Sequence, residues 1–137
     1  MLRVVVFLGN EEKSQRVFTV AQEAVKRVNT RCELTYARDA QKIYDNLALS
    51  TSYYDVYIFN GLNEECEKLT RKIRSNNLTA SIIFLSDDKL ENVLNIIRYR
   101  PSKVILSNGK AEEIVESIRF ACYEQMHFRP YFTIKNK

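Results

Sequence analysis

The polar residues of this sequence that could take part in chemistry follow short apolar runs. The run 54–59 ends at Asn60 and Gly61, which is typical of a buried central strand followed by a turn. In open α/β sheets, ligands and reactive groups lie at the carboxyl ends of strands, so residue 60 is the expected place for a functional group. The residue there is an amide, which cannot act as a carboxylate nucleophile and adds no negative charge to hold a cation.

Other polar residues follow apolar runs in the same way: Asn10 with Glu11, Ser86, and Ser107. Amides and hydroxyls form hydrogen bonds without carrying charge, so grouping them avoids the repulsion and burial cost of grouped carboxylates. We therefore expect Asn10, Asn60, Ser86 and Ser107 to form a neutral hydrogen-bonded network at one edge of a sheet. We also expect the fold to be stable without a metal ion.

The sequence offers little support for an enzyme or a metal site. Its three cysteines are widely spaced, its single histidine is His127, and its serines lack a nucleophile motif. The glycines are isolated, so the sequence contains neither a phosphate-binding loop nor a dinucleotide fingerprint. Asp87 and Asp88 could be a metal pair, but a helix N-cap with a solvated neighbour is the simpler interpretation. We expect no enzymatic activity, no cofactor and no bound metal.

Length and composition fit one soluble domain. The chain has 137 residues, of which 45% are hydrophobic and 28% charged, and a net charge of +4 that favours acidic partners only weakly. The first apolar run is too short for a signal peptide or a membrane span. We expect a cytoplasmic protein with reduced thiols and no membrane association.

Strand-like runs alternate with segments of helical spacing. Strands are predicted at 4–8, 32–37, 54–60, 81–86 and 104–107. Helices are predicted at 12–29, from Asp39 through Leu47, at 63–74, from Asp87 or Asp88 to the residues before Pro101, and after Gly109. The fourth helix carries the apolar residues Leu90, Val93, Leu94 and Ile97. Five strands alternating with five helices predict an α/β fold in which helices wrap a parallel sheet.

The C-terminal residues follow a different pattern. Residues 127–130 interrupt the helical spacing, and 131–135 form a new strand-like run. We interpret residues 1–126 as one domain, and 127–137 as a linker and the first strand of a C-terminal output domain. The alternative is a terminal arm that packs on the domain or on a partner.

In this order and at these spacings, several segments resemble the receiver domain of two-component response regulators. The segments are 6–12 (VFLGNEE), 54–60 (YDVYIFN), 82–86 (IIFLS), and Tyr99-Arg100-Pro101 followed by 104–107 (VILS). The most similar branch precedes a LytTR-type DNA-binding domain. The resemblance covers Met1 to about Gln125 and implies a flavodoxin-like, doubly wound sheet with strand order 2-1-3-4-5.

The functional positions of that family are only partly retained here. The acidic pair that binds magnesium falls on Asn10 and Glu11, and the phosphoacceptor aspartate falls on Asn60. The phosphate-sensing hydroxyl is retained as Ser86, whereas the lysine that pairs with phosphate falls on Ser107. The aromatic switch position is Val104. Phosphoryl transfer needs an oxygen nucleophile and a cation to neutralise charge, so the resemblance implies a degenerate receiver that is not phosphorylated.

In the resembling family, the face made by the fourth helix, the fifth strand and the fifth helix mediates dimerisation. The residues expected on this face are Arg98, Tyr99, Arg100, Lys103, Glu116, Arg119 and Tyr123. The sequence thus favours a regulatory module that forms a homodimer and is controlled by a sensor or regulatory protein. Such a module would contact DNA only through a separate output domain. The alternatives are a stand-alone module of the same fold that binds a small ligand or a protein partner, and a functional receiver with unusual ligands.

Overall fold

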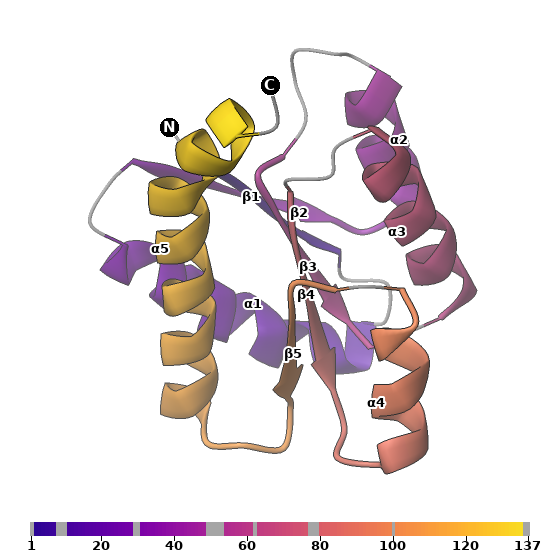
Figure 1. The fold of residues 1–137 in the computed structure, drawn as a ribbon. Helices are drawn as coiled ribbons and strands as arrows, with labels where there is room; N and C mark the ends of the chain where they lie inside the picture. Colours follow the sequence, from indigo (N-terminus) through magenta and orange to yellow (C-terminus); the bar gives the residue numbers. More distant parts are fainter. Residues whose placement is uncertain are drawn as a thin grey trace.

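The five predicted strands form a single parallel sheet (Figure 1). The computed structural model describes residues 2–7, 11–28, 31–48, 54–61, 63–76, 80–99 and 101–135, and within them all side chains except those of 11–14, 46, 48, 76 and 127–135. The strands are β1 (Leu2–Phe7), β2 (Cys32–Ala37), β3 (Val56–Asn60), β4 (Ser81–Ser86) and β5 (Lys103–Leu106). Their order is β2-β1-β3-β4-β5, which confirms the predicted topology. Central strands β3 and β4 are almost wholly buried, as their continuous apolar runs require.

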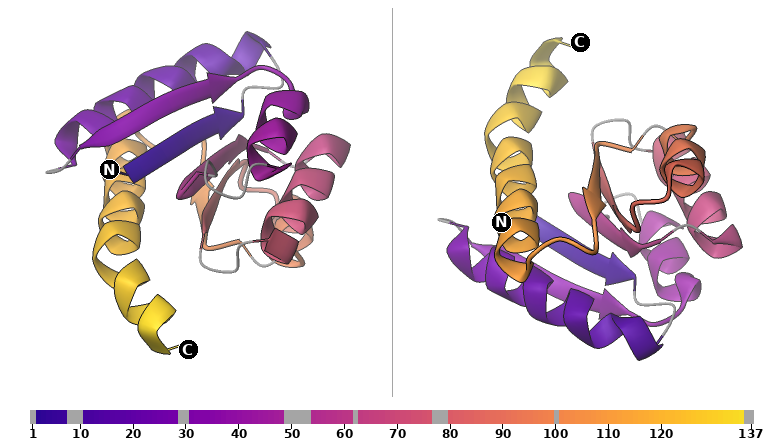
Figure 2. Two further views of the ribbon diagram at one scale, coloured as in Figure 1. Left: turned by 90° about the horizontal axis from the view of Figure 1, so that it is seen from above. Right: turned by 90° about the horizontal axis from the view of Figure 1, so that it is seen from below.

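Among the described residues, five helices cover the two faces of the sheet. They are α1 (Glu11–Arg27), α2 (Ala40–Ala48), α3 (Glu64–Asn76), α4 (Leu90–Ile97) and α5 (Ala111–Lys135). Helices α1 and α5 pack on one face, while α2, α3 and α4 pack on the other (Figure 2). Side chains that alternate along each strand therefore enter two separate hydrophobic cores. Val6 and Ile58 enter the first core, and Phe7 and Phe59 enter the second.

Short polar side chains cap the N-termini of two helices. The Asp39 carboxylate accepts a hydrogen bond from the backbone N–H of Gln41 at 3.0 Å, which confirms its predicted role as the cap of α2. The Asn63 side chain accepts a hydrogen bond from the backbone N–H of Cys66 at 2.9 Å and caps α3 in the same way. The expected aspartate cap of α4 is wrong in detail. The N-cap residue is Lys89, which forms no side-chain capping bond, and the Asp87 carboxylate instead accepts from the Lys89 N–H at 3.1 Å.

Helix α4 contributes little to the core. Its one fully buried side chain is Ile96, whereas Leu90, Leu94 and Ile97 are 71%, 50% and 51% exposed. Successive residues of an α-helix are rotated by about 100°, so these three exposed residues form a single stripe. By the same rotation, the stripe lies on the flank of α4 roughly opposite Asn92 and Asn95.

The strand expected at residues 131–135 is not present. Helix α5 continues through Pro130 to Lys135, so this prediction was wrong. A helix satisfies its backbone hydrogen bonds within itself, whereas a strand needs a neighbouring strand. In the described part of the chain, the sheet ends at the edge strands β2 and β5, and neither of them pairs with this segment. Intrinsic strand propensity is a weak determinant when no partner is available.

Two further properties concern the molecule as a whole. No helix among the described residues combines the length and apolar character needed to cross a membrane. Cys32, Cys66 and Cys122 are all free thiols, in agreement with the expectation drawn from their spacing.

Candidate functional site: the carboxyl edge of the sheet and an adjoining pocket

Three of the predicted site residues meet at the carboxyl edge of the sheet. In the register of the parallel strands, Asn60 ends β3 opposite Leu85, and Ser86 ends β4 opposite Leu106, the residue before Ser107. Gly61 follows Asn60 with a φ of +86°, a left-handed conformation that suits glycine, and its N–H donates to the Leu85 carbonyl at 2.8 Å. The chain therefore leaves β3 sharply and places the half-buried Asn60 at this edge.

The two serines are linked through the backbone. Both the N–H and the hydroxyl of Ser107 donate to the Ser86 carbonyl, at 2.7 and 3.1 Å. The Ser86 hydroxyl in turn donates to the Asp87 carbonyl at 3.0 Å. These are uncharged interactions of the expected kind, but their acceptors are carbonyl groups and not other side chains. Asn10, the fourth residue of the predicted network, lies outside the described residues, and the side chain of Glu11 at the start of α1 is not described.

A cation that the sequence did not suggest lies beside Ser107. The Arg16 guanidinium, from α1, donates to the Ser107 carbonyl at 2.6 Å and to the Gly109 carbonyl at 2.7 Å. Positive charge is thus present at this edge although residue 107 is a serine. Both terminal nitrogens of Arg16 are engaged by the loop between β5 and α5. Only the packing of α1 beside α5 brings the residues together, and no local sequence signal indicates it.

The residue at the switch position, Val104, packs in the middle of β5. It is partly buried against the core that contains Phe84 and Ile96. An aliphatic side chain there has no hydroxyl or ring to reorient between two environments, in contrast to the aromatic residue that the resemblance implies.

The described residues expected on one dimer face contact other parts of the same chain. Arg98 and Tyr99 lie beside α3, where the Arg71 guanidinium is 5.4 Å from the Tyr99 ring centre and donates to its hydroxyl at 3.4 Å. Lys103 lies 3.9 Å from Glu124 and 5.0 Å from the ring centre of Phe120. Arg100 lies outside the described residues.

Glu116 and Arg119 are paired within the chain. Arg119 donates to Glu116 at 2.8 Å, and Arg27 of α1 donates to both Glu112 and Glu116, at 2.5 and 2.8 Å. The hydrogen bond from Arg27 lowers the pKa of Glu112, and bonds from Arg119 and then Arg27 lower the pKa of Glu116. The same carboxylates raise the pKa of Arg27. These ion pairs join α1 to α5 on the first face of the sheet. Because the charged groups already have partners within the chain, we do not expect them to form ion pairs across a subunit interface.

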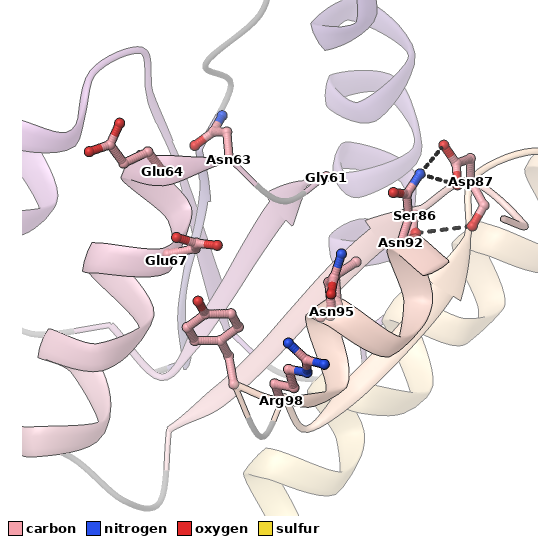
Figure 3. Close-up of a pocket in the computed structure, with 11 residues that line it drawn as sticks. Gly61, Asn63, Glu64, Glu67, Ser86, Asp87, Asn92, Asn95 and Arg98 are labelled. Carbon is pink, nitrogen blue, oxygen red and sulfur yellow. Dashed lines mark hydrogen bonds between the residues drawn. The ribbon is translucent and has the colours of Figure 1, made fainter. Parts of the chain in front are cut away.

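A polar pocket of about 510 Å³ adjoins the carboxyl edge (Figure 3). It lies between α3 and α4, and Gly61 and Ser86 line its end nearest the sheet. Its walls carry carboxylates, amides, a guanidinium and a phenol, including those of Glu67, Asn95 and Arg98. Sequence reasoning assigned Ser86, Arg98 and Tyr99 to other roles and did not indicate that they line one pocket, because only the folded chain brings α3 and α4 together.

Comparison with known proteins identifies the fold. No family model and no curated protein matches the sequence. Among solved structures, the phosphorylated cyanobacterial phytochrome response regulator RcpA is similar with a TM-score of 0.69 and 12% identity, over 92% of this chain and 94% of RcpA. A response regulator from Hahella chejuensis gives 0.69 and 16%, over 93% and 96% of the two chains.

A third structure carries a ligand. The receiver domain of sensor histidine kinase PA1611 from Pseudomonas aeruginosa PAO1, with a magnesium ion coordinated in its active site cleft, gives a TM-score of 0.68 at 12% identity. The match covers 89% of this chain and 98% of that domain. At these identities the similarity establishes architecture. The chain therefore has the fold of response-regulator receiver domains.

Proposed function

We propose that this chain is a cytoplasmic, non-enzymatic regulatory and dimerisation module with a receiver fold that acts without phosphorylation. The observation that carries the proposal is the amide of Asn60 at the carboxyl end of the central strand β3. By the sequence resemblance, this is the position of the phosphoacceptor. A carboxamide cannot form the acyl phosphate that such a position would require.

The other positions of the phosphorylation machinery support the same interpretation. RcpA is phosphorylated and the PA1611 domain holds magnesium, whereas here two of the three corresponding acidic positions are Asn10 and Asn60. Magnesium in proteins is held by one or two carboxylates and otherwise by water or phosphate, and a single Glu11 would bind it weakly. Without a metal ion, the charge that develops in phosphoryl transfer is not neutralised.

Arg16 does not replace the missing lysine. A lysine ammonium at residue 107 would project toward a phosphoryl group, but the Arg16 guanidinium donates to the Ser107 and Gly109 carbonyls. A phosphate would have to break these bonds before it could pair with the cation. Arg16 is better suited to fixing the β5–α5 loop in one position than to sensing an anion.

Exposed apolar side chains support dimerisation at a surface near that suggested by the resemblance. Every large hydrophobic side chain described as exposed lies on α4, β5 or α5: Leu90, Leu94, Ile97, Leu106, Phe120 and Tyr123. Apolar surface that gathers on neighbouring elements is typical of interfaces, and its removal from water would stabilise an assembly. We propose that a second copy of this chain covers them, through apolar contacts and not through Glu116 and Arg119.

Sedimentation velocity tests both parts of this proposal. The wild-type protein should sediment as a dimer at micromolar concentrations, with or without acetyl phosphate and magnesium. Leu94→Glu should produce monomers because it places a charge in the apolar stripe. The matched variant Gln22→Glu, at an exposed position of α1, should remain a dimer. A monomeric wild-type protein, a dimeric Leu94→Glu variant, or association that depends on acetyl phosphate would each contradict the proposal.

We also propose that DNA is contacted only through a separate output domain of LytTR type, with this module serving a transcription regulator. The support for this is the sequence resemblance. The continuation of α5 to Lys135 removes the argument from a terminal strand. The coding sequence that follows Lys137 is the direct test: a basic, strand-rich extension would support the proposal, and a stop codon at that point would contradict it.

The pocket between α3 and α4 favours a second candidate function, a binding module of the same fold for a small ligand or a protein partner. Its volume of about 510 Å³ lies within the range of small-molecule sites. A monomer in solution with an occupied pocket would favour this function. A dimer that forms through the exposed apolar side chains would favour the first function.

A further inference from the structure

The pocket between α3 and α4 has walls of different chemistry. Figure 3 shows Glu64 and Glu67 projecting from α3 on one side, and Asn95 and Arg98 projecting from α4 and its C-terminal end on the other. Along α4, Asn92 and Asn95 lie on the flank roughly opposite the exposed stripe of Leu90, Leu94 and Ile97. The amide-bearing side of this helix therefore faces α3 across the pocket.

Two opposite charges face this pocket without neutralising each other. Glu67 is half-buried and Arg98 is exposed, and among the described side chains neither belongs to an ion pair. The neighbouring Glu64 differs, because it pairs with Lys68 at 3.3 Å. A carboxylate and a guanidinium that share a pocket but do not meet leave room for a molecule between them that carries both complementary charges.

The groups around these charges complete a polar binding surface. The Asn95 amide, beside Arg98, can both donate and accept, whereas Asn92 is held by the Asp87 carboxylate at 2.9 and 3.0 Å. Ile96 and the Tyr99 ring supply the apolar part of the lining. Small-molecule sites combine apolar contact with a few polar groups that fix orientation in the same way.

We propose that this pocket binds a small zwitterion, such as a free α-amino acid. The ligand ammonium pairs with Glu67, and the ligand carboxylate pairs with Arg98 and the Asn95 amide. An inorganic anion would leave Glu67 unpaired beside it, and a simple amine would leave Arg98 unpaired, whereas a zwitterion satisfies both in charge-assisted bonds. This inference is independent of the phosphorylation chemistry, and it requires neither the dimer nor a degenerate phosphoacceptor site.

Isothermal titration calorimetry of the whole chain with L-leucine, L-glutamine, L-lysine and L-glutamate tests the proposal. At least one of these amino acids should give saturable binding. Its N-acetyl and its carboxamide derivatives, which each lack one terminal charge, should bind at least tenfold more weakly. Glu67→Gln and Arg98→Gln should each weaken binding at least tenfold.

Matched controls separate the pocket from general surface charge. Glu65→Gln, at an exposed position in the same turn of α3 as Glu67, and Lys110→Gln, at an exposed remote position, should leave the dissociation constant unchanged. The Asn95 side-chain amide resonances should shift on binding, which reports the location directly. No saturable heat with any of the four amino acids would overturn the proposal. Equal binding of the singly charged derivatives, or wild-type affinity in both pocket variants, would also overturn it. These outcomes would leave the proposed phosphorylation independence standing, because that proposal is measured by covalent labelling.

Discussion

Arg16 and Ser107 lie 91 residues apart in the sequence and are joined by a hydrogen bond of 2.6 Å from the guanidinium to the backbone carbonyl. A second bond, 2.7 Å long, reaches the Gly109 carbonyl, so one side chain of α1 holds two successive parts of the β5–α5 loop. In the resembling family a lysine would stand at residue 107 and respond to phosphate. Here the cation is on another element and binds the loop backbone, which is a structural role.

Replacement of Arg16 should therefore loosen this loop. We expect Arg16→Met to lower the free energy of unfolding by about 1 kcal/mol. This value is below the usual range for hydrogen bonds to charged groups because Arg16 is solvent-exposed. Urea denaturation would measure the change, and hydrogen exchange should accelerate at the amides of 107–110. Lys26→Met, at an exposed position of the same helix, is the control. Unchanged exchange in the loop of Arg16→Met would contradict this role.

The charges that join α1 to α5 predict loss of stability in acid. Glu112 and Glu116 have a lowered pKa in the folded protein, so the unfolded chain binds their protons first as the pH falls. Their contribution is present above the ordinary glutamate pKa of about 4.3 and is lost as the pH falls through the lower folded value. The melting temperatures of the wild-type protein and Arg27→Gln should therefore differ more at pH 7 than at pH 3. An equal difference at both pH values would contradict this linkage.

The two kinds of apolar residue on α4 should respond differently to truncation. Ile96 is 1% exposed and anchors the helix to the second core, so Ile96→Ala should lower stability by about 2–4 kcal/mol. Leu94 is 50% exposed, and Leu94→Ala should change the stability of the monomer by no more than about 0.5 kcal/mol. Chemical denaturation of dilute protein measures both. A large loss of stability in Leu94→Ala under these conditions would place the stripe of Leu90, Leu94 and Ile97 in the core. That result would argue against an interface at this stripe.

The thiols should differ in reactivity according to burial. Burial raises the pKa of Cys66 to about 11 and that of Cys122 to about 12, and it also raises the pKa of Cys32, which is only half-buried. Alkylation requires the thiolate, and it also requires access. At pH 8, iodoacetamide should modify Cys32 first, while Cys66 and Cys122 should react only on unfolding. Peptide mass spectrometry would identify the sites. Equal rates at all three thiols in the folded protein would contradict the packing.

Much of the fold follows from local patterns that a single sequence reveals. The strand at 81–86 agrees with β4 at both ends because it is a continuous apolar run buried on both sides. The position of Asp39 at the start of α2 was predictable because capping is a local interaction. The closeness of Ser86 and Ser107 follows once the strand order is known, because the carboxyl ends of neighbouring parallel strands lie at the same edge of the sheet.

What the sequence could not provide depends on neighbours that only the folded chain brings together. The pattern singled out Leu90, Val93, Leu94 and Ile97 on α4, but the side chain that enters the core is Ile96, because spacing alone does not say which flank of an apolar helix meets the sheet. Residues 131–135 have strand-forming side chains but no neighbouring strand, and they continue α5. The Arg16 contact and the α3–α4 pocket are tertiary features of the same kind.

The central claim, that this receiver fold has lost its phosphoryl chemistry, is tested most directly by intact-mass spectrometry after incubation with acetyl phosphate and magnesium. The wild-type chain should show no added phosphoryl group. The variant Asn10→Asp/Asn60→Asp/Ser107→Lys, which restores the acidic and basic positions, should gain one that is absent when residue 60 stays Asn. A phosphoryl group on the wild-type chain, mapped to the carboxyl edge of the sheet, would contradict the account.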